Sequence, residues 1–199
     1  MTLSWGDLAP IDTARPAPSA EERVATRLAA LALAIARRTD LWRPIVRHDA
    51  DLRWHCRLAN LDDVEIWLLG WTAEQEVELH DHGGSAGAFA VAAGELSETY
   101  TEHGDRRPLR TAFCPAGIAR AFGPTRIHHV TNRGSEPATS VHVYSPPLTA
   151  MSFYELAPGR APRPVRVERI LDDEGAGEER ARPLPFATLD LQQQEEALR

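Results

Sequence analysis

The sequence predicts a mainly β protein, a small single barrel of the jelly-roll type that is preceded by one helix. Two observations support this prediction. Apolar residues recur at helical spacing near the N-terminus, and many short β-prone runs separated by glycine, proline or charged turns follow. A length of 199 residues suits one domain with a sizeable core. We expect an arm at residues 1–18, the barrel domain at 19–160, and an extension at 161–199 that packs on the barrel or trails from it.

The expected helix begins with a capping signal. Ser19 is followed three residues later by Glu22, which is the spacing of a capping box. The apolar residues that follow lie at helical intervals: Val24, Leu28, Leu31 and Ile35. We therefore expect a helix from about Ala20 to Arg38 that packs one face on the rest of the protein.

The expected strands begin after about residue 51. Eight candidates, separated mostly by turn residues, lie at 64–71, 77–82, 88–93, 95–101, 109–113, 126–132, 139–144 and 152–156. A further strand is predicted near 165–170. For residues 192–199 both a frayed helix and disorder remain open.

Composition restricts the function. The net charge of −7 argues against nucleic acid as a partner. No apolar run approaches the roughly 20 residues that span a bilayer, so we expect no membrane contact. Two cysteines are too few for a disulfide framework, and the first residues do not resemble a secretory signal. We expect a cytoplasmic monomer. The chain contains no lysine, which excludes a lysine nucleophile.

The most informative segment is His80-Asp81-His82. On a strand, two histidines two residues apart point off the same face, while Asp81 points off the other. Imidazole is a common metal ligand, and two on one face make half a site. A third ligand is predicted from His128 or His129, which are adjacent and therefore face opposite sides of a strand. We favour His128 and keep His129 as the alternative.

Three segments together resemble the bacterial members of the cysteine dioxygenase family of the cupin superfamily. The similarity extends from about residue 54 to 154, and its most specific matches are His80-x-His82, His128-x-Val-x-Asn132 and the run from Ser140 to Pro147. The resemblance implies a cupin barrel and a ferrous iron, Fe(2+), bound by His80, His82 and His128. It also implies oxidation of the thiol of L-cysteine by O₂ to cysteine sulfinic acid, as in cysteine catabolism.

The same resemblance assigns a second group of residues. Ser140, His142 and Tyr144 match the family's Ser-His-Tyr relay, and alternate positions of a strand would place them on one face. A tyrosine hydroxyl near the metal can contact substrate, His142 can orient it, and Ser140 can fix the tautomer of His142.

Substrate binding is expected from Tyr144, Arg57 and His55. By resemblance Arg57 matches the arginine that holds the substrate carboxylate, and an arginine fork suits a carboxylate. Arg53 lies four residues earlier and could share its face, so it remains an alternative. His55 stands where the family often has a tyrosine.

A cysteine that crosslinks to the tyrosine in mammalian members is matched here by Gly87. Cys56 and Cys114 do not match it, so no Cys-Tyr cofactor is expected.

Three other functions remain open. The substrate could be another small thiol such as 3-mercaptopropionate. The chain could be a non-catalytic metal-binding cupin, which the complete Ser-His-Tyr pattern disfavours. An isomerase or hydrolase would want a carboxylate near the metal, and the sequence places none there.

Overall fold

The computed structural model describes residues 19–157 and 160–170. The expected N-terminal arm at 1–18 and the open question about 192–199 lie outside these residues. No helix in the described part of the chain is long and apolar enough to cross a membrane.

The predicted helix is present as α1 (Ala20–Arg37), and its capping box is confirmed. The backbone N–H of Glu22 donates to Ser19 Oγ at 3.1 Å, and the Ser19 N–H donates back to the Glu22 carboxylate at 2.6 Å. A short helix that the sequence analysis missed, α2 (Thr39–Trp42), follows at once. Its Trp42 is buried and donates its indole N–H to the Ala36 carbonyl at 2.9 Å, which ties the two helices together.

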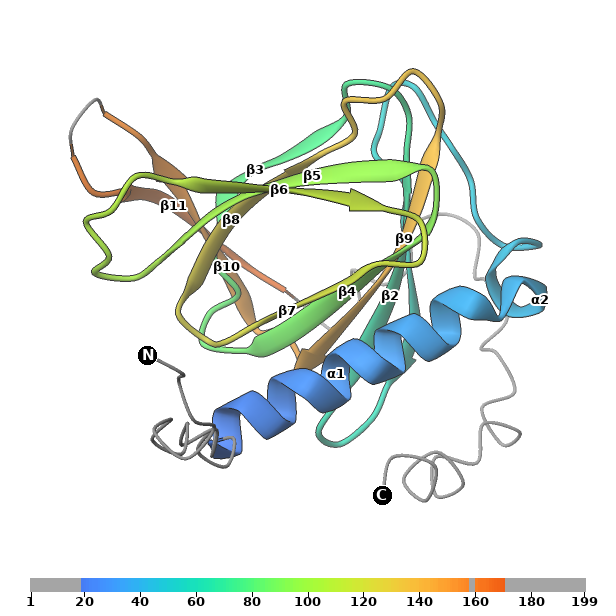
Figure 1. Cartoon of the computed structure of the whole chain (residues 1–199), viewed down its shortest axis with the longest axis horizontal. Coiled ribbons are helices and arrows are strands. Elements are labelled where there is room, and N and C mark those ends of the chain that lie inside the picture. The colour runs from blue at the N-terminus through green and yellow to red at the C-terminus, as the bar shows by residue number, and fades with distance from the viewer. Residues whose placement is uncertain (1–18, 158–159, 171–199) are drawn as a thin grey trace, which may run out of the picture.

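In the described part of the chain, eleven strands build two facing sheets (Figure 1). They are β1 (His55–Asn60), β2 (Glu65–Trp71), β3 (Glu76–His80), β4 (Ala86–Ala93), β5 (Glu95–Glu102), β6 (Arg110–Pro115), β7 (Ala119–Phe122), β8 (Arg126–Thr131), β9 (Ala138–Ser145), β10 (Ala150–Glu155) and β11 (Arg163–Arg169). The first sheet has the order β1-β2-β9-β4-β7 and the second β11-β10-β3-β8-β5-β6. All pairs are antiparallel, which confirms the predicted mainly β barrel.

Two of these strands were not predicted, β1 and β7. Both lie at an edge of the first sheet, where only one side is hydrogen-bonded. The β1 residues include little β-branched character, and β7 has four residues, so neither produces a clear alternating pattern. Pairing with longer, buried neighbours stabilises them instead.

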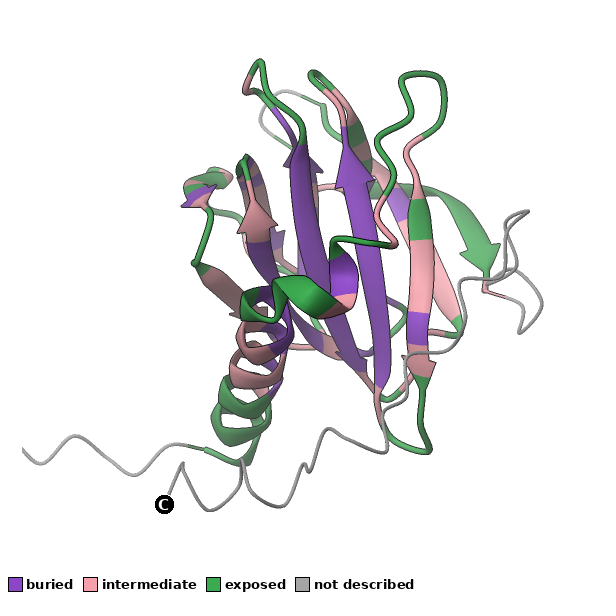
Figure 2. Cartoon of the chain, turned by 90° about the vertical axis from the view of Figure 1, so that its right-hand side faces the viewer, coloured by how far each residue is buried: buried purple, intermediate pink, exposed green. Residues whose placement is uncertain are grey.

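The first sheet separates two apolar clusters. Along β2, Leu68 packs toward α1 while Trp67 and Leu69 face the barrel interior. α1 lies across β4, β9 and β7 and covers this sheet (Figure 1). Figure 2 shows the buried central strands behind the helix. One face of the sheet therefore stabilises the fold, and the other is available to line an interior.

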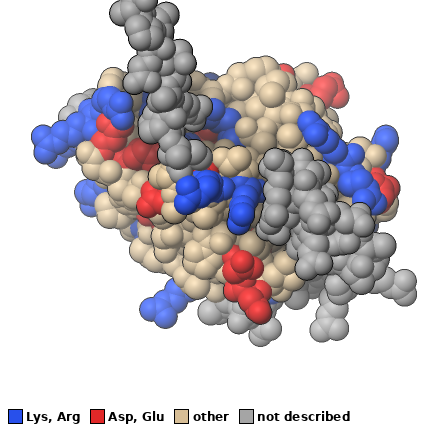
Figure 3. Space-filling view, turned by 60° about the horizontal axis from the view of Figure 1, so that its bottom comes forward, with Lys and Arg blue, Asp and Glu red and all other residues tan. Residues whose placement is uncertain are grey.

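The exterior is rich in arginine–carboxylate pairs. Figure 3 shows arginine and acidic side chains interspersed among uncharged ones on the face that it draws. Arg163 with Glu155 at 3.1 Å and Arg38 with Asp40 at 2.7 Å are two such pairs. At exposed positions they contribute little to stability.

Candidate metal centre and substrate pocket

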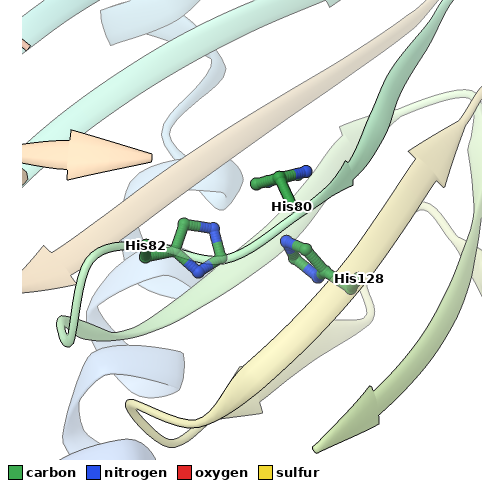
Figure 4. Close-up of side chains that lie close together, drawn as sticks. All are labelled: His80, His82 and His128. Atoms are coloured by element: carbon green, nitrogen blue, oxygen red, sulfur yellow. The ribbon is translucent and has the colours of Figure 1, made fainter. Parts of the chain in front are cut away.

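Three buried histidines meet inside the barrel (Figure 4). His80 ends β3, His82 follows two residues later, and His128 lies on β8 directly opposite His80. One nitrogen from each ring lies within 4.8 Å of the others. The strand was expected to continue through His82, but it ends at His80. Gly83 and Gly84 then turn the chain with φ values of 60° and 96°, and this turn carries His82 into the group.

Hydrogen bonds fix the orientation of two of the rings. His80 donates its Nδ1–H to the Glu78 carbonyl at 2.7 Å, and His128 donates its Nδ1–H to the Glu98 carboxylate at 2.9 Å. Both rings therefore keep Nε2 unprotonated, as a metal ligand requires. The third, His82, has a buried Nε2 without a hydrogen-bond partner among the described residues. A buried nitrogen of this kind is available to a metal ion.

Burial also keeps the three rings neutral. It lowers the pKa of His80 to about 4. Burial, and then the neighbouring histidines, hold the pKa values of His82 and His128 well below the ordinary value. Neutral imidazoles close together form a ready donor set for a divalent metal.

Asp81 points away from this group, as strand alternation predicts. Its carboxylate accepts hydrogen bonds from the Tyr154 hydroxyl at 2.5 Å, from His103 Nε2 at 3.1 Å and from the Gly83 N–H at 2.9 Å. A Cβ at Gly83 would lie 2.7 Å from the Ala150 carbonyl oxygen. Asp81 and the close approach of Gly83 thus hold the turn that presents His82.

The alternative ligand His129 lies on the other side of β8. Its Nε2 is 2.9 Å from the Glu76 carboxylate, and its side chain is 20 % exposed. Among the described residues the cluster contains His128 and not His129.

The Ser140, His142 and Tyr144 side chains form a continuous chain of hydrogen bonds on β9. Ser140 Oγ lies 2.9 Å from His142 Nε2, and His142 Nδ1 lies 3.2 Å from the Tyr144 hydroxyl. The Tyr144 ring lies 5.1 Å from the His82 ring, centroid to centroid. Burial lowers the pKa of His142 to about 3 and raises that of Tyr144 above its ordinary value. Both groups are therefore neutral at pH 7.

A cavity of about 420 Å³ opens beside the histidines. Its inner wall includes Arg53, His55, Trp71, His80, His128, His142 and Tyr144. Residues of β11 line it as well, among them Arg166, which lies over the Phe153 ring and pairs with Glu78 at 2.7 Å. The cavity therefore runs from the buried histidines to a charged and exposed wall.

The two candidate arginines are placed differently. Arg57 pairs with the buried Glu65 at 3.2 Å and is not among the described residues that line the cavity. Arg53 lines the cavity, lies 5.2 Å from the Trp71 ring centroid and pairs with no carboxylate of residues 19–157 or 160–170. Burial lowers its pKa. A half-buried guanidinium that faces a cavity without a counter-ion is suited to an anionic ligand.

The family model for cysteine dioxygenase type I matches residues 20–156. The chain belongs to the cysteine dioxygenase type I family. Two curated members of that family, both called cysteine dioxygenase type 1, are similar over a shorter region. The zebrafish (Danio rerio) protein is 28 % identical over 105 residues, or 47 % of this chain and 51 % of that protein. The rat (Rattus norvegicus) protein is 29 % identical over 104 residues, or 47 % and 50 %. The chain spans about half the length of the curated relatives it matches.

Two solved structures are similar to about half of this chain. A protein from Thermus thermophilus matches with a TM-score of 0.46 and 19 % identity, over 52 % of this chain and 92 % of that one. A double-stranded β-helix protein from Klebsiella pneumoniae matches with a TM-score of 0.44 and 22 % identity, over 52 % and 85 %.

One residue beside the candidate metal centre was not predicted from the sequence. Glu98 on β5 is completely buried and accepts hydrogen bonds from His128, from Arg126 at 3.0 Å and from Arg120 at 3.0 Å. Two arginines thus hold the carboxylate that orients a candidate metal ligand. The sequence did contain an indication that Glu98 is buried, because Glu98 lies two residues from Leu96 and so shares the inward face of the strand with it.

Proposed function

We propose that this chain is a non-haem iron dioxygenase that oxidises the thiol of L-cysteine to cysteine sulfinic acid. One O₂ is consumed per thiol, both oxygen atoms are transferred to sulfur, and the sulfur loses the four electrons that O₂ gains. One observation carries the proposal. A single cavity is lined by metal-binding histidines, by the tyrosine that ends a buried hydrogen-bond chain and by an arginine without a carboxylate partner among the described residues.

The histidine group fits a ferrous ion. His80, His82 and His128 would bind it as three neutral donors, so the ion would keep its full charge of +2 and would have positions open to ligands from solution. Iron bound there would supply a cationic centre that binds the substrate thiolate and activates O₂. The absence of a carboxylate from the cluster favours anionic substrates, of which a thiolate is one.

The residues around the histidines would position the substrate. We assign the carboxylate to Arg53, in the role that the sequence suggested for Arg57, because Arg53 faces the cavity and Arg57 is paired with Glu65. Tyr144 and His55 also line the cavity and would contact the substrate. Ser140 and His142 would act through Tyr144.

A second candidate substrate is 3-mercaptopropionate, which has the same thiol and carboxylate but no amine. The acidic residues that line the cavity are each engaged elsewhere. Glu76 contacts His129, and Glu78 and Glu168 both pair with Arg166. The described residues therefore offer a cation for the substrate carboxylate but no unpaired carboxylate for an ammonium group. This favours a substrate that has no ammonium group.

Oxygen uptake by the iron-loaded protein tests these proposals. Cysteine, 3-mercaptopropionate and cysteamine should be compared, with the sulfinate quantified by mass spectrometry. Cysteine turnover with one O₂ per sulfinate is expected. Faster turnover of 3-mercaptopropionate would favour the second candidate, and no uptake with any thiol would favour a non-catalytic metal-binding cupin.

Elemental analysis tests the metal site separately. His80→Ala, His82→Ala and His128→Ala should each lose stoichiometric iron, whereas His129→Ala should retain it. Retention of iron by His128→Ala would contradict the assignment.

A further inference from the structure

The hydrogen-bond chain on β9 extends one residue beyond Ser140. Trp71, at the end of β2, donates its indole N–H to Ser140 Oγ at 2.9 Å. Trp71 and Ser140 are both completely buried, and His142 is 4 % exposed. Hydrogen bonds therefore connect four side chains in an environment that largely excludes water: Trp71, Ser140, His142 and Tyr144.

The indole determines which group donates at each step. Its N–H can only donate, so it occupies a lone pair of Ser140 Oγ. The serine has one proton, and His142 Nε2 is the only acceptor within reach of it among the residues of the described chain. Leaving a buried hydroxyl proton unpaired would cost free energy. Ser140 therefore donates to Nε2, and the proton of the neutral His142 ring lies on Nδ1.

The same logic continues to the cavity. The Tyr144 hydroxyl oxygen lies 3.2 Å from His142 Nδ1, so a proton on Nδ1 would be donated to it. The phenolic proton of Tyr144 is then not donated to His142. Because Tyr144 lines the cavity, that proton is available to a group bound there. With the opposite direction, Tyr144 would donate to His142 and offer the cavity only an acceptor.

We propose that Trp71 is a positioning residue that sets the direction of this hydrogen-bond chain, and so makes Tyr144 a hydrogen-bond donor toward the bound substrate. The proposal rests on the proposed function for its catalytic meaning, although the direction itself can be measured without metal or substrate. The surroundings hold the participants in place. Phe89 stacks on the His142 ring at 5.4 Å with an interplanar angle of 19°, and the Arg53 guanidinium lies over Trp71.

Nuclear magnetic resonance of the metal-free protein tests the proposal. In protein labelled with ¹⁵N at histidine, the two ring-nitrogen shifts of His142 report its tautomer, and a His142→Gln spectrum assigns them. The Nδ1–H form is expected in the wild type at pH 7. Trp71→Phe removes the N–H and keeps an aromatic ring under Arg53, and it should raise the Nε2–H population.

Trp67→Phe is the matched control. Trp67 lies on the same strand, and its buried indole N–H has no hydrogen-bond partner among the described residues. This variant should leave the His142 tautomer unchanged. An Nε2–H tautomer in the wild type would overturn the proposal, and so would a Trp71→Phe spectrum identical to the wild type. If Trp71→Phe does not fold, Ser140→Ala replaces it. This variant should shift the Trp71 indole resonance and not that of Trp67, and an unmoved Trp71 resonance would overturn the proposal.

Activity gives a second, separate readout. In the iron-loaded protein, Trp71→Phe should lower kcat for cysteine by about tenfold, the effect of one hydrogen bond, with little change in KM. Absence of turnover in the wild type would contradict the proposed function while leaving the tautomer result to decide the direction. A changed tautomer with unchanged kcat would overturn the claim that the direction serves the substrate.

Discussion

Gly87 lies directly opposite Tyr144 across the β4–β9 ladder. The space beside Gly87 is already occupied. A Cβ at this position would lie 2.6 Å from two carbons of the Phe122 ring and 2.9 Å from the Val143 carbonyl oxygen. The Phe122 ring in turn stacks on His82 at 4.7 Å with an interplanar angle of 20°. Where mammalian members place a crosslinking cysteine, this chain places an aromatic ring that packs on a predicted metal ligand.

Tyr144 should therefore remain an unmodified phenol. Intact mass of the purified iron-loaded protein should show no loss of two hydrogens after turnover with cysteine. Gly87→Cys should not restore a crosslink, because the new side chain collides with Phe122 and must displace it. The double variant Gly87→Cys with Phe122→Ala removes that collision and serves as the comparison. A crosslinked mass in Gly87→Cys alone would contradict this account of the packing.

Tyr144→Phe should keep iron and fold but lose much of the sulfinate yield. Its ring still packs beside His82, while the hydroxyl that faces the cavity is gone. Loss of one such hydrogen bond corresponds to roughly 1–2 kcal/mol in the transition state. The ratio of sulfinate formed to O₂ consumed measures the effect. Wild-type rate and coupling in this variant would show that Tyr144 has a structural role alone.

Arg53→Ala should lower kcat/KM for cysteine far more than for cysteamine, which has no carboxylate. Removal of a charge-assisted contact inside the cavity corresponds to roughly 2–4 kcal/mol. Arg57→Ala is the matched comparison, because it removes the partner of Glu65 and no residue of the cavity wall. We expect it to reduce stability more than specificity. Equal losses on both substrates in Arg53→Ala, or a cysteine-specific loss in Arg57→Ala, would reverse the assignment.

Glu98→Gln should weaken iron binding by about 10–100-fold, because the carboxylate that orients His128 is replaced by a neutral amide. The variant also leaves two arginines without their shared counter-ion, so its folding must be checked by thermal unfolding. Competition with a chelator measures the affinity. Glu102→Gln is the control, since Glu102 pairs with Arg126 and does not contact His128. Equal affinities in the two variants would contradict the role of Glu98.

Acid should destabilise the metal-free protein well above the pKa values of its carboxylates. Burial lowers the pKa of His80 to about 4 and that of His142 to about 3. In the unfolded chain both rings titrate near 6.5. Between these values the unfolded state binds more protons, so the free energy of unfolding falls as the pH falls below about 6.5. Each ring contributes a slope of up to about 1.4 kcal/mol per pH unit.

Urea unfolding at pH 7.5, 6 and 5, with a chelator present, tests this dependence. In His142→Gln the free energy of unfolding should fall less steeply with falling pH than in the wild type. The slope should differ by up to about 1.4 kcal/mol per pH unit. A free energy of unfolding that stays constant from pH 7.5 to pH 5 would rule the explanation out.

The sequence predicted the fold where the local pattern was strong. The α1 helix has a capping box and a regular apolar stripe, and its first residue was predicted correctly. β1 and β7 were missed because edge strands depend on their neighbours and carry little pattern of their own. The short α2 depends on the tertiary burial of Trp42, which no local signal indicates.

For the site, the alternation of faces along a strand distinguished the two candidate histidines but not the two candidate arginines. His128 was preferred to His129 because of the residues with which each shares a strand face. The histidine cluster contains His128. Arg53 and Arg57 have the same parity, so only the three-dimensional position of Glu65 separates them. Glu98 was overlooked although it shares a strand face with Leu96, because the two arginines that pair with its buried charge are distant in sequence.

The cavity wall is assembled from two parts of the chain that differ in their similarity to the family. The histidines and the Tyr144 chain lie within residues 20–156, the region shared with the family, whereas β11 lies beyond it. Yet β11 supplies Arg166 and Glu168 to the same cavity, and Ile170 follows directly after it. The buried histidines and the charged part of the cavity wall are thus encoded in separate segments of the chain. Replacing the β11 segment would therefore change the charged side chains of the cavity wall while leaving the sequence of the histidine cluster untouched.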